Sequence, residues 1–413
     1  MATDAGPSPL FDGIAVWLMA QGLSDVGLPE TIRGFGQRLV AGGLPVHRIG
    51  IGGMLLHPVF GALDIVWRAQ NDQLTDDVVP RAKLNSPEFR SSPYFQAATD
   101  DLALQRFRLE QPTLDMEYPI FEELRAAGVT DYILFYRNYG RRDVGLWAGL
   151  PIGIEGALGS FSTRRLGGFS DLEVAYLQAL VTPLALVIKA KTDRELTRTL
   201  LDTYLGKLSG DQVRNGLIER GDGQPIECVI WYSDLRSSTA LAEKLSMADY
   251  LAMLDAYFDC TAGAVLDHGG EVLKFIGDAV MAIFPFEDER RPAVDMCRAA
   301  VNTTREALAR AERLNADRRQ RGEQAFAFGV SLHVGEVLYG NVGTERRLDF
   351  TVIGPAANEA ARLEQLSKTL GTPVIASATF AKLRPDDLID VGRHKVVGVK
   401  DPLAAHTLKE LVP

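Results

Sequence analysis

Two carboxylates stand beside apolar segments in the second half of the chain. Asp234 follows the apolar run ECVIWYS and precedes the hydroxyl-rich RSST, and Asp278 stands between VLKFI and AVMAIF. A carboxylate at a strand end can bind Mg²⁺, while the free N–H groups of a following helix can bind anionic oxygens. Taken singly, Asp234 could cap a helix and Asp278 could be a turn residue. As a pair they suit a site in which two metal ions, about 3.5 to 4 Å apart, hold phosphoryl oxygens.

A third segment, FTVIGPAANEAARLE, predicts a strand followed by a helix. Pro355 suits the first turn of that helix. The four-residue spacing places Asn358 and Arg362 on one helical face. As an isolated surface pair these two side chains would carry no function, so their interpretation depends on the segments that accompany them.

The second half of the chain resembles the catalytic domain of class III adenylate and guanylate cyclases. The resemblance rests on SDLRSST, KFIGDAVMAIF, HVGEVLYGNVG and FTVIGPAANEAARLE, which occur in this order. It implies a ferredoxin-like α/β sandwich, in which the ribose 3′-hydroxyl of a nucleoside triphosphate attacks the α-phosphorus without a covalent enzyme intermediate. It also implies that Asp234 and Asp278 bind two Mg²⁺ or Mn²⁺ ions. Asn358 would orient the ribose, and Arg362 would neutralise charge on the α-phosphoryl oxygens.

Two positions choose the base in this family, and here they are Lys274 and Thr351. A lysine ammonium donates hydrogen bonds and suits adenine N1, while a threonine hydroxyl can accept one from the adenine 6-amino group. Guanine presents the opposite pattern. The resemblance therefore implies ATP as the substrate and cyclic AMP as the product. The same Lys and Thr combination resembles the subgroup that includes bicarbonate-responsive cyclases, so stimulation by bicarbonate is a hypothesis for this chain.

Lys274 and Asp278 lie four residues apart around a predicted hairpin. One is assigned to the base and the other to the phosphate end of ATP, so one chain can hardly serve both for the same nucleotide. This agrees with the head-to-tail homodimer of the family. One subunit would supply the aspartates and its partner the base, ribose and phosphoryl contacts, which gives two equivalent sites.

Three positions depart from the family pattern. Ser237 stands where the family often has glycine, and Pro355 where it commonly has aspartate. Val397 stands where a lysine often binds the triphosphate. Lys395 or Arg393 could take over that role.

Rival readings of the same half stay open. A non-catalytic or guanylate-using signalling and dimerisation module of this fold would predict loss of a metal, base or phosphoryl residue, yet all of these are present. A diguanylate cyclase needs a GGDEF-like turn where this chain has IGDAV. An RNA-recognition domain would need stacking aromatics that the sequence does not supply.

The first half alternates helical and extended patterns and resembles a GAF-like α+β sensory domain. Helical spacing runs from Trp17 to Val40, and VHRIGIGGMLLH, ALDIVWRAQN, YILFYRNYG, VGLWAGLP and GALGSFSTRR read as strands around a polar loop that ends near Pro112. We predict a regulatory domain over residues 1–190, a helical connector over 191–222 and a catalytic domain over 223–413. The regulatory partner would be a small-molecule or protein signal that the sequence does not identify.

The connector carries two capping-box patterns. Thr192 is followed three positions later by Glu195, and Ser209 by Gln212. Each pattern predicts the start of a short helix.

The composition of the chain limits the cellular locations and the classes of binding partner that we expect. Acidic residues exceed basic ones by 54 to 44, giving a net charge of −10, and no basic block is interleaved with aromatics, so a nucleic-acid partner is not expected. The longest apolar stretch, 174–188, falls short of the roughly 20 residues of a membrane span. No basic and apolar leader opens the sequence. We therefore expect a cytoplasmic protein with free cysteines and no membrane span.

Overall fold

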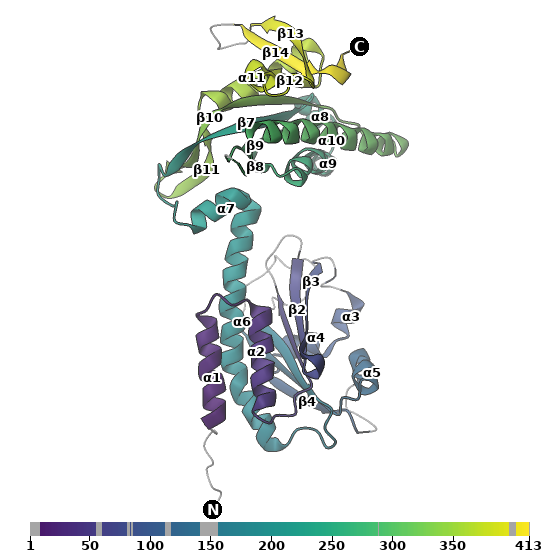
Figure 1. The fold of residues 1–413 in the computed structure, drawn as a ribbon. Coiled ribbons are helices and arrows are strands. Elements are labelled where there is room, and N and C mark those ends of the chain that lie inside the picture. The colour runs from purple at the N-terminus through teal and green to yellow at the C-terminus, as the bar shows by residue number, and fades with distance from the viewer. Residues whose placement is uncertain are drawn as a thin grey trace, which may run out of the picture. The chain divides into compact units, whose positions relative to one another are not determined.

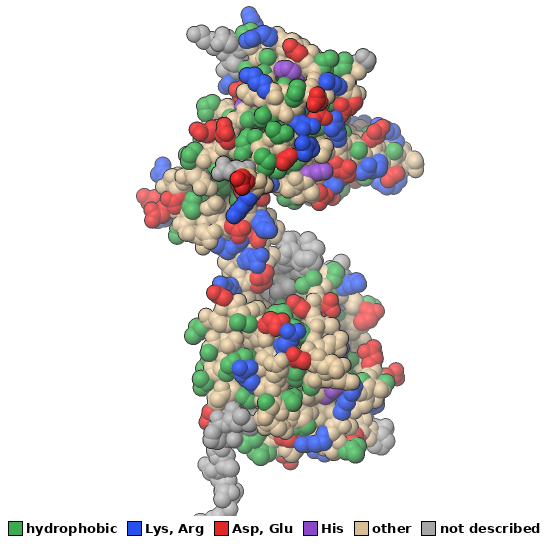
Figure 2. Space-filling view, in the orientation of Figure 1, with side chains coloured by type: hydrophobic (Ala, Val, Ile, Leu, Met, Phe, Trp, Pro, Cys, Tyr) green, Lys and Arg blue, Asp and Glu red, His purple; other side chains and the backbone are tan. Residues whose placement is uncertain are grey.

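The computed structural model describes residues 9–54, 60–80, 83, 86–111, 117–140, 156–287, 289–395 and 402–412. The chain forms two compact units, Met1–Leu200 and Leu201–Pro413. Each unit is built on one β-sheet with helices on both faces (Figure 1). Lys and Arg side chains are interspersed with Asp and Glu over the face of each unit that Figure 2 shows.

The N-terminal unit contains a six-stranded sheet of order β3-β2-β1-β6-β5-β4, and its neighbouring strands are antiparallel. Helices α1, α2 and α6 lie side by side on one face (Figure 1), and α4 and α5 pack on the other. The strands are β1 (Arg48–Met54), β2 (Phe60–Arg68), β3 (Gln73–Pro80), β4 (Leu104–Arg108), β5 (Asp131–Asn138) and β6 (Gly156–Thr163). The helices are α1 (Pro9–Gly22), α2 (Leu28–Ala41), the short η1 (Gln70–Asp72), α3 (Pro87–Arg90), α4 (Pro93–Thr99), α5 (Pro119–Ala126) and α6 (Asp171–Leu205).

Part of the N-terminal unit differs from the sequence prediction. The expected helix from Trp17 to Val40 is two helices, α1 and α2, and the expected polar loop before Pro112 contains β3, α3, α4 and β4. β3 is exposed along most of its length, so its sequence QLTDDVVP lacks the apolar alternation of a half-buried strand. The strand expected at VGLWAGLP lies outside the described residues.

Helix α6 is continuous where two helices were expected. Thr192 was predicted to open a second helix, but its hydroxyl donates to the carbonyl oxygen of Ile188 at 2.7 Å inside α6. A threonine hydroxyl often bonds back to the preceding turn in this way, so the local capping pattern misleads here. By length and composition α6 could cross a membrane, although several of its apolar residues, Leu177, Val181 and Leu184 among them, are buried in the N-terminal core.

The C-terminal unit contains a sheet of order β13-β14-β12-β10-β7-β9-β8, and β11 pairs with β10. The central path β10-β7-β9-β8 is antiparallel throughout, and helices connect β7 to β8 and β9 to β10. This is the βαββαβ arrangement of a ferredoxin-like sandwich. The strands are β7 (Gly223–Leu235), β8 (Glu271–Ile276), β9 (Ala279–Pro285), β10 (Phe328–Thr344), β11 (Arg347–Ile353), β12 (Val374–Ser377), β13 (Leu388–His394) and β14 (Leu403–Leu408). The helices are α7 (Lys207–Arg214), α8 (Ser238–Lys244), α9 (Met247–Asp267), α10 (Ala293–Gln320), α11 (Pro355–Leu370), α12 (Ala378–Ala381) and the short η3 (Lys409–Leu411).

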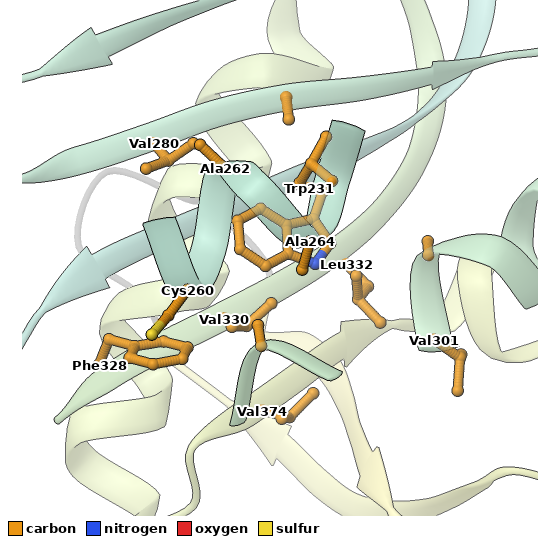
Figure 3. Packing of buried hydrophobic residues seen from close by; sticks show 14 of the residues in the cluster. Trp231, Cys260, Ala262, Ala264, Val280, Val301, Phe328, Val330, Leu332 and Val374 are labelled. Atoms are coloured by element: carbon orange, nitrogen blue, oxygen red, sulfur yellow. The ribbon is translucent and has the colours of Figure 1, made fainter. Parts of the chain in front are cut away.

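The central strand β7 is buried on both faces, which explains its continuous apolar run. Trp231 lies in the core that α9 and α10 cover, together with Cys260 and Phe328 (Figure 3). Its indole N–H donates to the hydroxyl of Thr304 at 2.9 Å. On the opposite face, α11 packs against β7 and β10 with small residues such as Ala360. Helices on both faces therefore hold β7 in place.

Helix α7 is fixed to two strands of the C-terminal sheet. Its N-cap is Gly206, with φ of 84°, so Ser209 lies inside the helix and does not open it as predicted. The backbone N–H of Leu208 donates to Glu271 of β8 at 2.8 Å. The hydroxyls of Ser209 and Tyr339 of β10 lie 2.6 Å apart in a hydrogen bond. A carboxylate at a helix N-terminus is favourable because it meets unpaired N–H groups.

Candidate active site

Strand pairing brings Asp234 and Asp278 to one end of the C-terminal sheet. Asp234 pairs with Ala279 across β7 and β9, and Asp278 directly precedes Ala279 in the turn between β8 and β9. Gly277 has φ of 63°, the left-handed backbone that such a tight turn requires. Asp234 belongs to β7, and α8 has its N-cap at Ser237 without a side-chain cap bond, so Asp234 is not a helix cap. Both carboxylates are half-buried.

Two neighbouring tyrosines are influenced by both aspartates. Burial raises the pKa of Tyr232 to about 12, and the charges of Asp234, Glu364 and Asp278 add to the increase. Burial also raises the pKa of Tyr257, whose hydroxyl lies 2.7 Å from that of Ser233, and the same carboxylates contribute. The two aspartates therefore create one shared region of negative potential.

Asp234 already attracts a cation from its own chain. The ammonium of Lys368, in the last turn of α11, lies 2.6 Å from Asp234 Oδ2 and 3.8 Å from Glu364 Oε2. Burial acts to lower the pKa of Lys368, but the hydrogen bond to Asp234 and the nearby carboxylates outweigh it and raise that pKa. Burial raises the pKa of Glu364, against the opposing effect of Lys368. The end of the sheet that holds Asp234 thus favours positive charge.

The donor set fits a divalent cation that shares its ligands with a substrate. Among the described residues no group of three or more His, Cys, Asp and Glu side chains could hold a metal by itself. Mg²⁺ commonly binds through one or two carboxylates and completes its shell with phosphate oxygens and water. Asp234 and Asp278 supply such carboxylates, and the ammonium against Asp234 shows that the carboxylate accepts a positive partner here.

The predicted base-reading residues lie on β8 and β11, two strands that are in contact but do not pair with each other. Lys274 of β8 forms an ion pair with Asp349 of β11 at 3.0 Å, and Thr351 lies two residues further along β11. The Thr351 hydroxyl is buried and has no hydrogen-bond partner within the part of the chain that the structure describes. A buried hydroxyl left unpaired is unfavourable, so this one can gain from a polar ligand.

Asn358 and Arg362 both lie on α11, as predicted, with Pro355 in its first turn. Asn358 is exposed and Arg362 is half-buried. For the residues that the structure describes, no hydrogen bond or ion pair is formed by either side chain. Val397, the remaining position of interest, lies outside the described residues, and Lys395 is exposed.

Sequence reasoning missed the partners of the charged residues. Lys368 and Glu364 have the four-residue spacing of a helical ion pair, which was the only local signal. Asp349 had no such signal, because it meets Lys274 only through the contact of β11 with β8. Asp349 lies 75 positions from Lys274, and Lys368 lies 134 positions from Asp234.

Comparison with known proteins agrees with this geometry. Residues 223–409 match the sequence model of the family described as "Adenylate and Guanylate cyclase catalytic domain". "Adenylate cyclase 1" of Rhizobium meliloti (strain 1021) is 34% identical over 153 residues, which cover 37% of this chain and 22% of that protein. The adenylate cyclase of Anabaena cylindrica is 28% identical over 196 residues, covering 46% of this chain and 37% of that protein. The chain thus spans well under half of the length of these relatives.

Among solved structures, the adenylyl cyclase CyaB from P. aeruginosa has 25% sequence identity and a TM-score of 0.42, with 46% of this chain and 100% of that chain covered. The expected class of catalytic domain is confirmed by the family match and by relatives that are adenylate cyclases. The part of the chain from residue 223 to residue 409 is therefore an adenylate/guanylate cyclase catalytic domain.

Proposed function

We propose that this chain is an adenylate cyclase, which converts ATP to 3′,5′-cyclic AMP and pyrophosphate. The observation that carries the choice of ATP is the presence of Lys274 on β8 and of a buried Thr351 hydroxyl, unpartnered among the described residues, on β11, a strand that contacts β8. The ammonium can donate to adenine N1, and the hydroxyl can accept from the 6-amino group. The names of two relatives, both adenylate cyclases, favour the same substrate.

At the phosphate end, Asp234 and Asp278 would hold two Mg²⁺ or Mn²⁺ ions. When bound, such ions make the ribose 3′-hydroxyl easier to deprotonate and neutralise charge on the triphosphate. Arg362 would donate to the α-phosphoryl oxygens as their negative charge grows, and Asn358 would fix the ribose so that its 3′-oxygen faces the α-phosphorus. Both side chains come from one helix, which keeps their spacing constant.

We propose a homodimer with two shared sites. Lys274 and Asp278 flank one tight hairpin, so their side chains cannot reach opposite ends of the same nucleotide. The absence of partners for Asn358 and Arg362 among the described residues agrees with a role toward a nucleotide held by the other subunit. Each site would then combine the aspartates of one protomer with the lysine, threonine, asparagine and arginine of its partner.

We propose that residues 1–190 form a GAF-like regulatory domain and that its signal passes through the connector, 191–222. The antiparallel sheet between two helical layers supports the first idea. The attachment of α7 to Glu271 and Tyr339 supports the second, since Glu271 is three residues before Lys274 and Tyr339 pairs with the neighbour of Thr351. A shift of α7 would therefore act on β8, which carries Lys274, and on β10, which pairs with the strand of Thr351. We also propose that the signal is a small molecule or a protein, that bicarbonate stimulates turnover, and that the protein is cytoplasmic.

The test is turnover by the purified full chain, with ATP or GTP and with Mg²⁺ or Mn²⁺. We expect cyclic AMP from ATP as the main product, and a loss of at least about 100-fold in Asp278→Ala, because one metal ligand is removed. Cyclic AMP formation that survives this substitution would refute the two-metal site. A preference for GTP would refute the roles of Lys274 and Thr351.

A further inference from the structure

The phosphate end contains a lysine that the proposed reaction does not use. Lys368 places its ammonium 2.6 Å from Asp234 Oδ2, although the two residues lie 134 positions apart. The Lys368 side chain is 46% exposed, so it can leave this position without disrupting the core. Lys368 therefore occupies an oxygen of the carboxylate that would hold a divalent cation.

A second carboxylate lies within reach of the same ammonium. Glu364 Oε2 is 3.8 Å from Lys368 Nζ, and the Glu364 side chain is only 2% exposed. Its other oxygen lies 3.4 Å from Arg236 and 3.0 Å from the Ser367 hydroxyl, which itself accepts a hydrogen bond from Arg236 at 2.6 Å. Glu364 is thus fixed on one side and open to Lys368 on the other.

The backbone beside Asp234 is adapted to this cluster. Gly329 of β10 pairs with Asp234 of β7, and a β-carbon there would collide with Glu364, Ser367 and Arg236. These three side chains therefore fill a space that only glycine leaves free. Arg236 follows Asp234 by two residues on the same segment, so the strand that presents the aspartate also positions the support of Glu364.

We propose that Lys368 is a positioning residue that holds Asp234 while no metal is bound and transfers its ion pair to Glu364 when a divalent cation arrives. This inference rests on the proposed function, since it assumes that Asp234 is a metal ligand. An ammonium and a divalent cation repel each other when they share one carboxylate oxygen. Lys368 moves because it is half exposed, and Glu364 receives it because Glu364 is fixed. The lysine thereby weakens metal binding and keeps Asp234 in its binding orientation.

The experiment measures Mn²⁺ binding to the full chain with a non-cyclising ATP analogue at fixed concentration, from the electron paramagnetic resonance signal of free Mn²⁺. A titration of the same analogue without protein is subtracted. We expect Lys368→Gln to lower the apparent Kd by about three- to tenfold, because the competing cation is gone. Lys368→Arg keeps a cation and should stay within about twofold of the wild type. Lys382→Gln removes an exposed lysine that forms no ion pair with the described residues, and it controls for net charge.

Glu364→Gln should act in the opposite direction and raise the Kd, because Lys368 then has no second carboxylate to pair with. Circular dichroism would verify that this variant folds. A Kd that is unchanged or raised in Lys368→Gln overturns the inference alone, provided that the wild type binds Mn²⁺ and Asp278→Ala abolishes binding. Absence of Mn²⁺ binding in the wild type, or binding unaffected by Asp278→Ala, overturns the proposed metal site and the inference with it.

Discussion

The two ends of the proposed active site hold their charged residues in different ways. At the phosphate end, Asp234 pairs with Lys368 at 2.6 Å, and at the base end Lys274 pairs with Asp349 at 3.0 Å. Asp234, which would meet a metal ion, and Lys274, which would meet the base, are therefore each paired with a side chain of the same chain. Both pairs must open before ligand binds.

The surroundings of the two pairs differ. Lys368 is also close to the buried Glu364, which Arg236 supports, whereas Asp349 is 59% exposed and forms no second ion pair among the described residues. Exposed ion pairs contribute about 0 to 1 kcal/mol, so Asp349 can release Lys274 at little cost. Breaking the ion pair of Lys368 with Asp234 instead rearranges a partly buried network that includes Glu364. We therefore expect metal loading, more than base recognition, to require a change in the protein.

The largest effect is expected when the two ends of the site are inactivated on different chains of the dimer. Asp278→Ala and Arg362→Ala should each reduce turnover by about 100-fold or more. Mixed in equal amounts, they should recover up to about a quarter of the wild-type rate, because half of the dimers are heterodimers and each has one intact site. Mixing Asp278→Ala with Asp234→Ala, two changes on the same side, is the control and should give no recovery. Equal rates in both mixtures would contradict the shared site.

At the base end, Lys274→Ala should lower kcat/KM for ATP by about 10- to 100-fold, since a site built to hydrogen-bond the base loses its donor. GTP turnover should change less. Steady-state kinetics with both nucleotides checks this, with the exposed Lys382→Ala as the matched control. An equal loss for ATP and GTP would assign Lys274 to folding or phosphate binding.

A third test concerns the strand that links the base end to α7. Burial raises the pKa of Glu271 above its ordinary value of 4.5, against the effect of its backbone hydrogen bonds. The unfolded chain therefore loses this proton first, and the folded state loses stability as pH rises from the ordinary pKa to the raised one. We expect the free energy of unfolding to decline less over this range in Glu271→Gln than in the wild type.

Denaturant titrations from pH 4 upward measure that difference. Glu219→Gln, at an exposed position, is the control and should follow the wild type. A decline in Glu271→Gln that matches the wild type would show that Glu271 is ionised without cost in the folded protein.

At the phosphate end, the backbone after Asp234 is strained. Ser237 has φ of 58°, a left-handed conformation that costs a non-glycine residue about 1 kcal/mol. Ser237→Gly should therefore raise the free energy of unfolding by about 0.5 to 1 kcal/mol, less the extra freedom that glycine gains in the unfolded chain. Chemical denaturation measures it. Ser238→Gly, inside α8, should give no gain.

The smallest effect is expected for the counter-ion of Lys274. Asp349→Asn should change kcat/KM for ATP by less than about threefold, because the pair is exposed. A change of more than tenfold would show that Asp349 positions Lys274 for the base, and the contrast between the two ends would no longer hold.

The sequence predicted the catalytic half far better than the N-terminal half. Pro355, the glycine turn before Asp278 and the run through Trp231 are local signals, and each corresponds to the element expected from it. β3 escaped prediction because an exposed edge strand needs no apolar alternation. The ion pairs of Lys368 and Asp349 escaped as well, because their geometry exists only after distant strands and helices have packed.

A substitution at Gly329 could abolish activity without changing any residue of the catalytic motifs. A substitution there leaves all six proposed site residues unchanged. It nevertheless forces Glu364, Ser367 and Arg236 out of the space that they share. A homologue could therefore retain the whole catalytic signature and still be an inactive pseudoenzyme. A homologue with a working metal site would therefore need glycine at this position as well, although Gly329 has no side chain and binds no ligand.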